Sequence, residues 1–152
     1  MPPLPPSTYL RIARASALYD IVQALPFATP WTFALVYDAL SRLNTWLGAP
    51  ALPACAPPHL LLGTLLGTLV LLWSVSRLGA PSLRLGRYDG AGRLLFACWI
   101  GWAMTRADMP VLWLFLLPEI GWGVAQWWPV ARTMSAGVMS FTPAAAAPRA
   151  RP

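Results

Sequence analysis

The sequence contains no charged residue between Arg42 and Arg77, and this gap constrains the fold more than any other feature. Within it, residues 59–76 read HLLLGTLLGTLVLLWSVS. As a helix this stretch covers about 27 Å, which approaches the thickness of the hydrocarbon core of a bilayer. Pro57 and Pro58 precede it directly, where the start of a helix tolerates proline. The sequence therefore predicts a transmembrane helix over residues 59–76.

Composition supports a membrane environment for the rest of the chain. Of its 152 residues, 57% are hydrophobic and 11% are charged, whereas a soluble domain averages about 25% charged residues. This composition excludes an ordinary soluble fold, a disordered chain and a nucleic-acid-binding module. All 11 basic residues are arginine, and we expect the lipid bilayer, with no nucleic acid, as the main partner.

Two further spans are predicted near the C-terminus. Residues 109–131 form an apolar stretch whose only charged residue is Glu119. Residues 89–105 form another, with Asp89 placed to cap its start. Arg93 lies about one turn inside that span, so its side chain is expected to extend to the membrane surface. The short connection between the two spans predicts a helical hairpin.

The first predicted span, residues 10–27, is the most polar because it holds Arg14, Asp20 and Gln23. An aspartate at the centre of a span costs about 2.5–3.5 kcal/mol on insertion scales, so this helix is expected to rely on its neighbours. A cleaved signal peptide is an alternative interpretation of this segment. It is disfavoured because the segment lacks a clean apolar core.

An amphipathic helix is predicted over residues 30–47. Thr29 and Pro30 supply an N-cap and a first-turn proline, and apolar residues then recur at helical spacing. Such a helix suits the membrane interface. The alternative is a single span over residues 15–37, broken at Pro26 and Pro30. We favour the shorter first span followed by an interfacial helix.

These elements predict an all-α integral membrane four-helix bundle, with the amphipathic helix in the first outer loop. Residues 1–8 and 132–152 are expected to be flexible tails. The arginines test the orientation, because cytoplasmic loops carry an excess of them. With an inside N-terminus, the inner side carries Arg11, Arg14, Arg77, Arg84, Arg87, Arg93, Arg132, Arg149 and Arg151, and the outer side carries Arg42 and Arg106. This bias predicts a multi-pass protein of the cytoplasmic (inner) membrane with both termini cytoplasmic.

A candidate intramembrane polar site lies near mid-span. Ionisable residues at such a depth are candidates for function. Counted from the inner surface, Asp20 lies about 15 Å deep and Glu119 about 18 Å deep. Gln23 shares the helix face of Asp20, and Gln126 shares that of Glu119. We include Arg93 because it lies inside the third span.

Two interpretations of this site remain open. If Asp20 and Glu119 face each other, they would share a proton, and the pair could relay protons, bind a cation or hydrogen-bond a quinone-like headgroup. Alternatively, the polar stripes only fix helix packing, and we favour this alternative. Arg14 is a candidate partner for Asp20, whereas neither Arg14 nor Arg93 is expected to reach Glu119.

Other motifs are less informative. Gly63 and Gly67 form a GxxxG pattern, which predicts either close packing inside the bundle or a contact in a homodimer. Cys55 and Cys98 are expected at different depths, so no disulfide is predicted between them. A lone His59 is weak evidence for a metal. The chain has no phosphate-binding loop, HExxH motif or nucleotide fingerprint, so we expect no cofactor and no metal.

The segments RYDGAGRLLFACWIGWA (residues 87–103) and LFLLPEIGWGVAQ (residues 114–126) resemble the second half of small bacterial membrane proteins of the DoxX and BphX-like type. This resemblance implies an accessory membrane subunit, linked in some members to quinone-dependent oxidation. The leading hypothesis is thus a non-enzymatic accessory or scaffold protein with a membrane-protein partner. A proton-coupled small-molecule carrier using Glu119 and a quinone-associated redox subunit are the alternatives.

Overall fold

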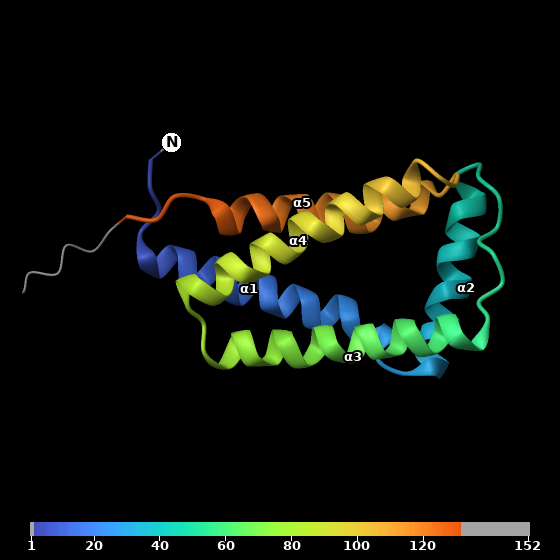
Figure 1. Cartoon of the computed structure of the whole chain (residues 1–152), viewed down its shortest axis with the longest axis horizontal. Helices are drawn as coiled ribbons and strands as arrows, with labels where there is room; N and C mark the ends of the chain where they lie inside the picture. Colours follow the sequence, from blue (N-terminus) through green and yellow to red (C-terminus); the bar gives the residue numbers. More distant parts are fainter. Residues whose placement is uncertain (1, 132–152) are drawn as a thin grey trace, which may run out of the picture.

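The computed structural model describes residues 2–131, and this part of the chain is helical (Figure 1). Its elements are α1 (Pro6–Ala24), the 3₁₀ turn η1 (Leu25–Phe27), α2 (Pro30–Trp46), α3 (Pro57–Gly79), α4 (Leu83–Met104), the 3₁₀ turn η2 (Pro110–Leu112) and α5 (Trp113–Trp127). Within residues 2–131 the only β-type pairing is an isolated bridge between Leu4 and Val130. The all-helical fold class is confirmed. The predicted tail over residues 132–152 lies outside the described residues.

Four helices run along the long axis of the molecule, and α2 crosses one end of them (Figure 1). Helix α3 packs on α1, and α4 packs on α5, so the bundle consists of two helix pairs. The start of α1, the α3–α4 turn and the end of α5 lie at one end of the bundle. Helix α2 and the α4–α5 turn lie at the other end. For brevity we call these the first end and the α2 end.

Helices α1 and α4 begin at least four residues earlier than the sequence predicted. Helix α1 begins at Pro6, because a proline in the first turn needs no backbone N–H partner. Helix α4 begins at Leu83, where the Ser82 side chain caps it by accepting a hydrogen bond from the Leu85 N–H at 3.2 Å. The prediction that Asp89 caps this helix is therefore wrong, because Asp89 lies well inside it and is buried.

The N-terminal segment is also more structured than expected. The Leu4 N–H donates to the Pro129 carbonyl at 2.8 Å, and the Ala131 N–H donates to the Leu4 carbonyl at 2.9 Å. These bonds tie the residues before α1 to the residues after α5. The prediction that residues 1–8 are a tail is wrong for its described part.

The predicted cap of α2 is confirmed, since the Thr29 hydroxyl accepts from the Thr32 N–H at 3.2 Å. Helix α1 ends at Ala24, and η1 separates it from α2, which runs in a different direction (Figure 1). The interruption is expected because Pro26 and Pro30 cannot donate the backbone bonds of a continuing helix. The structure thus has two separate helices here.

Asn44 joins α2 to the loops at the α2 end of the bundle. Its side chain is fully buried. The amide nitrogen donates to the Pro50 carbonyl at 2.8 Å and to the Asp108 carbonyl at 3.3 Å. The amide oxygen accepts from the Val111 N–H at 3.2 Å. One side chain therefore bonds to three backbone groups, one in the α2–α3 connection and two in the α4–α5 connection.

Among residues 2–131, α3 is the one helix that is long and apolar enough to cross a membrane by length and composition. The other long helices differ from it in identifiable ways. Helices α1 and α4 each carry several charged residues, and α5 has 15 residues. Only 11% of the most apolar stretch of α3 is buried inside the bundle.

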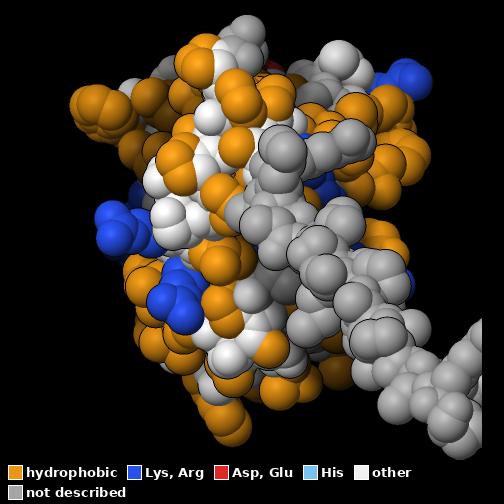
Figure 2. Space-filling model, turned by 90° about the vertical axis from the view of Figure 1, so that its left-hand side faces the viewer, with side chains coloured by type: hydrophobic (Ala, Val, Ile, Leu, Met, Phe, Trp, Pro, Cys, Tyr) orange, Lys and Arg blue, Asp and Glu red, His pale blue; other side chains and the backbone are white. Residues whose placement is uncertain are grey.

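The distribution of side chains is the reverse of that in a soluble protein. The buried side chains include two arginines, three acidic residues, Gln126 and Asn44, whereas most large apolar side chains are exposed. The exposed apolar residues of α3 are Leu61, Leu62, Leu65, Leu66, Leu69, Leu72, Trp73 and Val75. Viewed from the first end, hydrophobic side chains cover much of the surface, and basic side chains lie around its rim (Figure 2).

Candidate functional site

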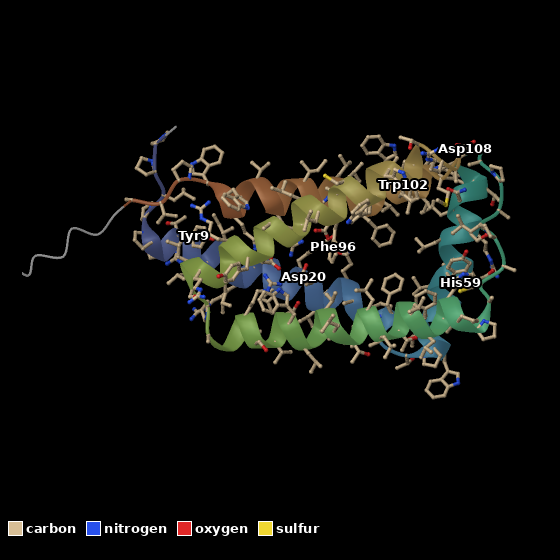
Figure 3. All side chains as sticks on the ribbon, in the orientation of Figure 1. Tyr9, Asp20, His59, Phe96, Trp102 and Asp108 are labelled. Carbon is tan, nitrogen blue, oxygen red and sulfur yellow. The ribbon has the colours of Figure 1, made fainter. Side chains whose placement is uncertain are left out.

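Two arginines and three acidic residues meet inside the bundle. Asp20 comes from α1, Arg77 from α3, Asp89 and Arg93 from α4, and Glu119 from α5. Each residue is at most 8% exposed. Asp20 lies midway along the bundle, far from Tyr9 at the first end and from His59 and Asp108 at the other end (Figure 3). We call these five residues the charged cluster.

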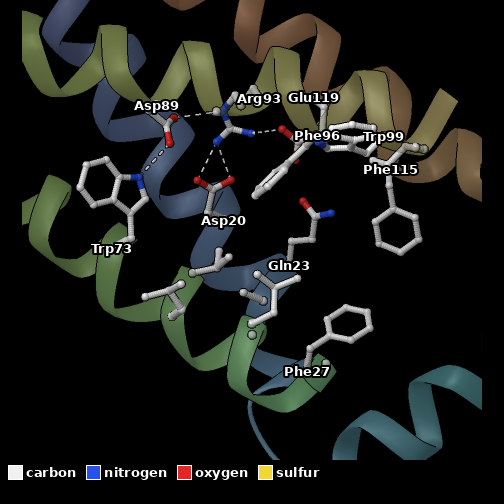
Figure 4. Close-up of a pocket in the computed structure, with 18 of the residues that line it drawn as sticks. Asp20, Gln23, Phe27, Trp73, Asp89, Arg93, Phe96, Trp99, Phe115 and Glu119 are labelled. Carbon is white, nitrogen blue, oxygen red and sulfur yellow. Dashed lines mark hydrogen bonds and ion pairs between the residues drawn. The ribbon is translucent and has the colours of Figure 1, made fainter. Parts of the chain in front are cut away.

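Arg93 contacts all three acidic residues of the cluster (Figure 4). Its Nη2 lies 2.6 Å from Asp20 Oδ1, and its Nε lies 3.0 Å from Asp89 Oδ2. Its Nη1 lies 3.2 Å from Glu119 Oε2. A planar guanidinium group presents its donors in fixed directions, so one arginine can join carboxylates from α1, α4 and α5.

Arg77 forms the second set of ion pairs in the cluster. Its Nη1 lies 2.6 Å from Asp89 Oδ2, and its Nη2 contacts Asp20. Arg77 is in the last turn of α3, so these ion pairs join α3 to α1 and α4. Together the two arginines link all four long helices.

Neutral polar side chains complete the cluster. Gln126 donates from Nε2 to Asp89 Oδ2 at 2.7 Å and to the Ser16 hydroxyl at 2.8 Å. Trp73 Nε1 donates to Asp89 Oδ1 at 3.0 Å. Asp89 therefore accepts hydrogen bonds at both oxygens, as a buried carboxylate requires.

The structure brings together most of the predicted site residues. Asp20, Arg93, Glu119 and Gln126 all belong to the cluster or contact it directly, whereas Gln23 lies outside the hydrogen-bonded network. The sequence-based hypothesis that Asp20 faces Glu119 is correct in placing the two carboxylates in the same part of the bundle. Arg93 bonds to both carboxylates, so a guanidinium group joins the two acids.

Three predictions about the arginines are wrong. Arg93 is 3% exposed, so its side chain stays inside the bundle and does not extend outward as predicted. It reaches Glu119, although the sequence analysis expected that it would not. Arg14 is exposed, and Asp20 pairs with Arg77 and Arg93 instead. The buried acids attract the arginines inward because a buried charge needs an opposite charge close by.

Sequence reasoning missed Arg77 and Asp89 as site residues. Arg77 was counted only as a determinant of orientation, and Asp89 only as a helix cap. The sequence did hold one signal, because Asp89 and Arg93 are four residues apart and share a helix face. The two charges would have suggested a pair within α4. Nothing local indicated the partners on α1 and α3.

The cluster does not balance its own charge. When all five groups are ionised, three carboxylates give −3 and two guanidinium groups give +2, for a net charge of −1. Asp20 and Asp89 each contact both arginines, whereas Glu119 contacts Arg93 alone. Within residues 2–131, Glu119 Oε1 accepts no hydrogen bond. Glu119 is therefore the least compensated carboxylate of the cluster.

A cavity of about 710 Å³ lies beside the cluster, between α3 and α4 (Figure 4). Its polar end includes Asp20, Arg93, Glu119 and the Gln23 amide, which points into it. The rest of its lining is apolar and rich in aromatic rings. The aromatic residues that line it are Phe27, Phe33, Trp73, Tyr88, Phe96, Trp99 and Phe115.

The cavity opens sideways, through the surface of the bundle. Leu66 and Leu69 on α3 and Phe96 and Trp99 on α4 line it and are themselves exposed. These residues form the two edges of the opening. An opening at this place faces the medium that surrounds the helices and neither end of the bundle.

The GxxxG glycines pack inside the chain. A Cβ at Gly67 would lie 2.7 Å from backbone atoms of Phe27, and a Cβ at Gly63 would lie 2.2 Å from the Phe33 ring. These glycines let α3 approach η1 and α2 closely. Of the two alternatives for this motif, the structure has the intramolecular one. Cys55 and Cys98 are free thiols.

Comparison with known proteins assigns no relative. No protein-family model, curated protein or solved structure matches the chain at a significant level. Within residues 2–131, no group of three or more His, Cys, Asp or Glu side chains is arranged to hold a metal ion.

Proposed function

We propose that this chain is an integral membrane protein in which α1, α3, α4 and α5 cross the bilayer and α2 lies in the outer interface. The support is the reversed distribution of side chains, with charged groups at the centre and large apolar side chains outside. Lipid accommodates an apolar exterior of this kind, whereas water does not. Helices α1 and α4 can cross because their central charges are paired inside the bundle.

The proposal includes the orientation. The first end carries the exposed Arg11, Arg14 and Arg84. The α2 end carries the exposed Arg106 and Arg42, and Arg42 is paired with Asp38 at 2.6 Å. Two of the arginines that favoured a cytoplasmic first end, Arg77 and Arg93, are buried in the cluster and are left out of this count. The larger number of exposed arginines at the first end still favours the cytoplasm for that end.

For its activity, we propose that the protein is a non-enzymatic accessory protein of the cytoplasmic membrane that binds a lipid-soluble molecule in the cavity. The observation that carries this proposal is the side opening between α3 and α4, which joins an apolar cavity to the surface that lipid would cover. Cavities with apolar walls and a few converging polar groups are typical ligand sites. A role beside a membrane partner, as the resemblance to DoxX-like proteins implies, is part of the same proposal.

A proton-coupled carrier is the second candidate, because Glu119 lines the cavity and carries the least compensated charge. It makes a distinct prediction. In proteoliposomes, a carrier would accumulate its ligand when a pH gradient is applied, and Glu119→Gln would abolish this accumulation. A non-transporting accessory protein would bind the ligand without accumulating it. The quinone-associated redox subunit would instead copurify with a quinone.

Two glycines of α4 allow a matched test of the cavity. A Cβ at Gly92 or at Gly101 would meet no atom within 4 Å, but only Gly92 lines the cavity. We expect Gly92→Phe to fill the cavity and Gly101→Phe to leave it unchanged. Lipid-soluble compounds extracted from the purified proteins are compared by mass spectrometry. A compound retained by the wild type and by Gly101→Phe, but lost from Gly92→Phe, supports the proposal, and identical extracts from all three would refute it.

A further inference from the structure

Three features of the cavity together define the charge of its ligand. The cluster at its polar end has a net charge of −1 with all groups ionised, as counted above. Its least compensated carboxylate, Glu119, lines the cavity. Beyond this polar end, the lining is mostly apolar. A charge of this kind, held away from water, calls for an opposite charge nearby.

We infer that the cavity is a binding site for a monovalent organic cation with a hydrophobic body, with Glu119 as the counter-ion of the cationic group. This inference rests on the proposed function, since it names the class of molecule that the cavity holds. One positive charge brings the cluster and its ligand to neutrality. An anionic ligand would lower the net charge to −2 inside a mostly apolar cavity.

The aromatic lining fits the same class of ligand. Phe96, Trp99 and Phe115 line the same cavity as Glu119 (Figure 4). Aromatic faces attract cations, most strongly where water is excluded. They also pack against a hydrophobic body. A strongly hydrated inorganic cation would gain little here, because the site offers few oxygen ligands and many rings.

Gln23 lies at the polar end of the cavity and is the polar group best placed to orient the ligand. Its amide points into the cavity (Figure 4), and within residues 2–131 it takes no part in the network around Arg93. An amide can donate or accept a hydrogen bond. It can therefore hold a polar substituent beside the cationic group.

Two ions of the same shape and opposite charge test the inference. Radiolabelled tetraphenylphosphonium and tetraphenylborate are equilibrated with the purified full-length protein in detergent, and bound ion is measured after gel filtration. We expect the cation to bind at least about tenfold more tightly than the anion. Equal binding of both ions, or tighter binding of the anion, would overturn the inference.

Two variants locate the charge that discriminates between the ions. Glu119→Gln should lower the affinity for tetraphenylphosphonium by about tenfold or more. Asp38→Asn is the matched control, because it removes one acidic charge from an exposed site on α2 and should leave binding unchanged. An undiminished affinity in Glu119→Gln would overturn the assignment of Glu119. The wild-type comparison of the two ions stands even if this variant does not fold.

The same experiment separates the inference from the proposed function. Gly92→Phe should abolish binding of either ion, whereas Gly101→Phe should not. If both ions bind equally and Gly92→Phe abolishes this binding, the cavity holds ligands but selects no charge. If neither ion binds and a quinone copurifies with the wild type but not with Gly92→Phe, the proposed function stands and the cationic ligand is refuted. If no ligand depends on Gly92, both fail.

Discussion

Replacing Arg93 by glutamine should destabilise the bundle more than any other single substitution in the charged cluster. The change removes one of the two positive charges and leaves three buried carboxylates with Arg77 alone, so the net charge falls from −1 to −2. Glu119→Gln has the opposite effect, because it brings the cluster to neutrality. The two substitutions are therefore expected to differ although both break the same ion pair.

The magnitude follows from the contacts that are lost. Removing one partner of a buried ion pair costs about 3–5 kcal/mol, and Arg93 has three acidic partners. We expect Arg93→Gln to lower the free energy of unfolding by at least this amount. Glu119→Gln breaks one ion pair, of 3.2 Å, and also removes the excess negative charge. We therefore expect it to lower the free energy of unfolding by about 1 kcal/mol or less.

Both changes in the free energy of unfolding can be measured on the purified proteins in detergent. The proteins are unfolded with increasing dodecyl sulfate, and circular dichroism reports the loss of helix. Arg84→Gln is the control, because Arg84 is an exposed arginine on the same helix. It should change stability by about 0.5 kcal/mol at most. Adding Asp20→Asn to Arg93→Gln returns the net charge to −1 and should recover about 0.5–3 kcal/mol. If Arg93→Gln is as stable as Arg84→Gln, the argument that the cluster holds the helices together is refuted.

Three further predictions test other parts of the molecule. Reporter fusions after Arg84 should be cytoplasmic and after Trp46 periplasmic, and a periplasmic Arg84 would contradict the proposed orientation. Gly67→Ala should lower the free energy of unfolding by about 1–3 kcal/mol, because the new Cβ would meet backbone atoms of Phe27. Gly121→Ala is the control, because a Cβ there meets nothing within 4 Å and should not destabilise the protein. Equal stability of the two variants in dodecyl sulfate would contradict the close packing at Gly67. Asn44→Ala should lower the free energy of unfolding by about 2 kcal/mol or more, because it leaves buried backbone groups unpaired. An unchanged thermal midpoint of unfolding in detergent would contradict this role of Asn44.

The sequence determined the elements whose signals are local. The apolar run over residues 59–76 is contained in α3, and the cap and proline at Thr29 and Pro30 mark the start of α2. These signals depend only on neighbouring residues, so tertiary packing left them unchanged. Helix α4 shows where a local signal misled. Ser82 and Asp89 are both residues that cap helices, and sequence alone could not tell which one was needed as a cap and which as a buried acid.

Counting residues also predicted the height of the candidate site along the bundle. Counting residues along each span placed Asp20 and Glu119 at similar heights, and the structure brings them into one cluster. Depth follows from the rise per residue of a helix, which hardly varies.

Only the tertiary structure decided which charges meet. Arg93 bonds to Asp20 across 73 residues of chain and to Glu119 across 26, and Arg77 bonds to Asp20 across 57. These contacts depend on how each helix is rotated about its own axis, and packing against the other helices sets that rotation. The cavity arises for the same reason, because α3 packs on α1 and α4 packs on α5, which leaves space between the two pairs. Residue spacing sets the position of a side chain along its helix, whereas its partner depends on which faces the helices present to one another.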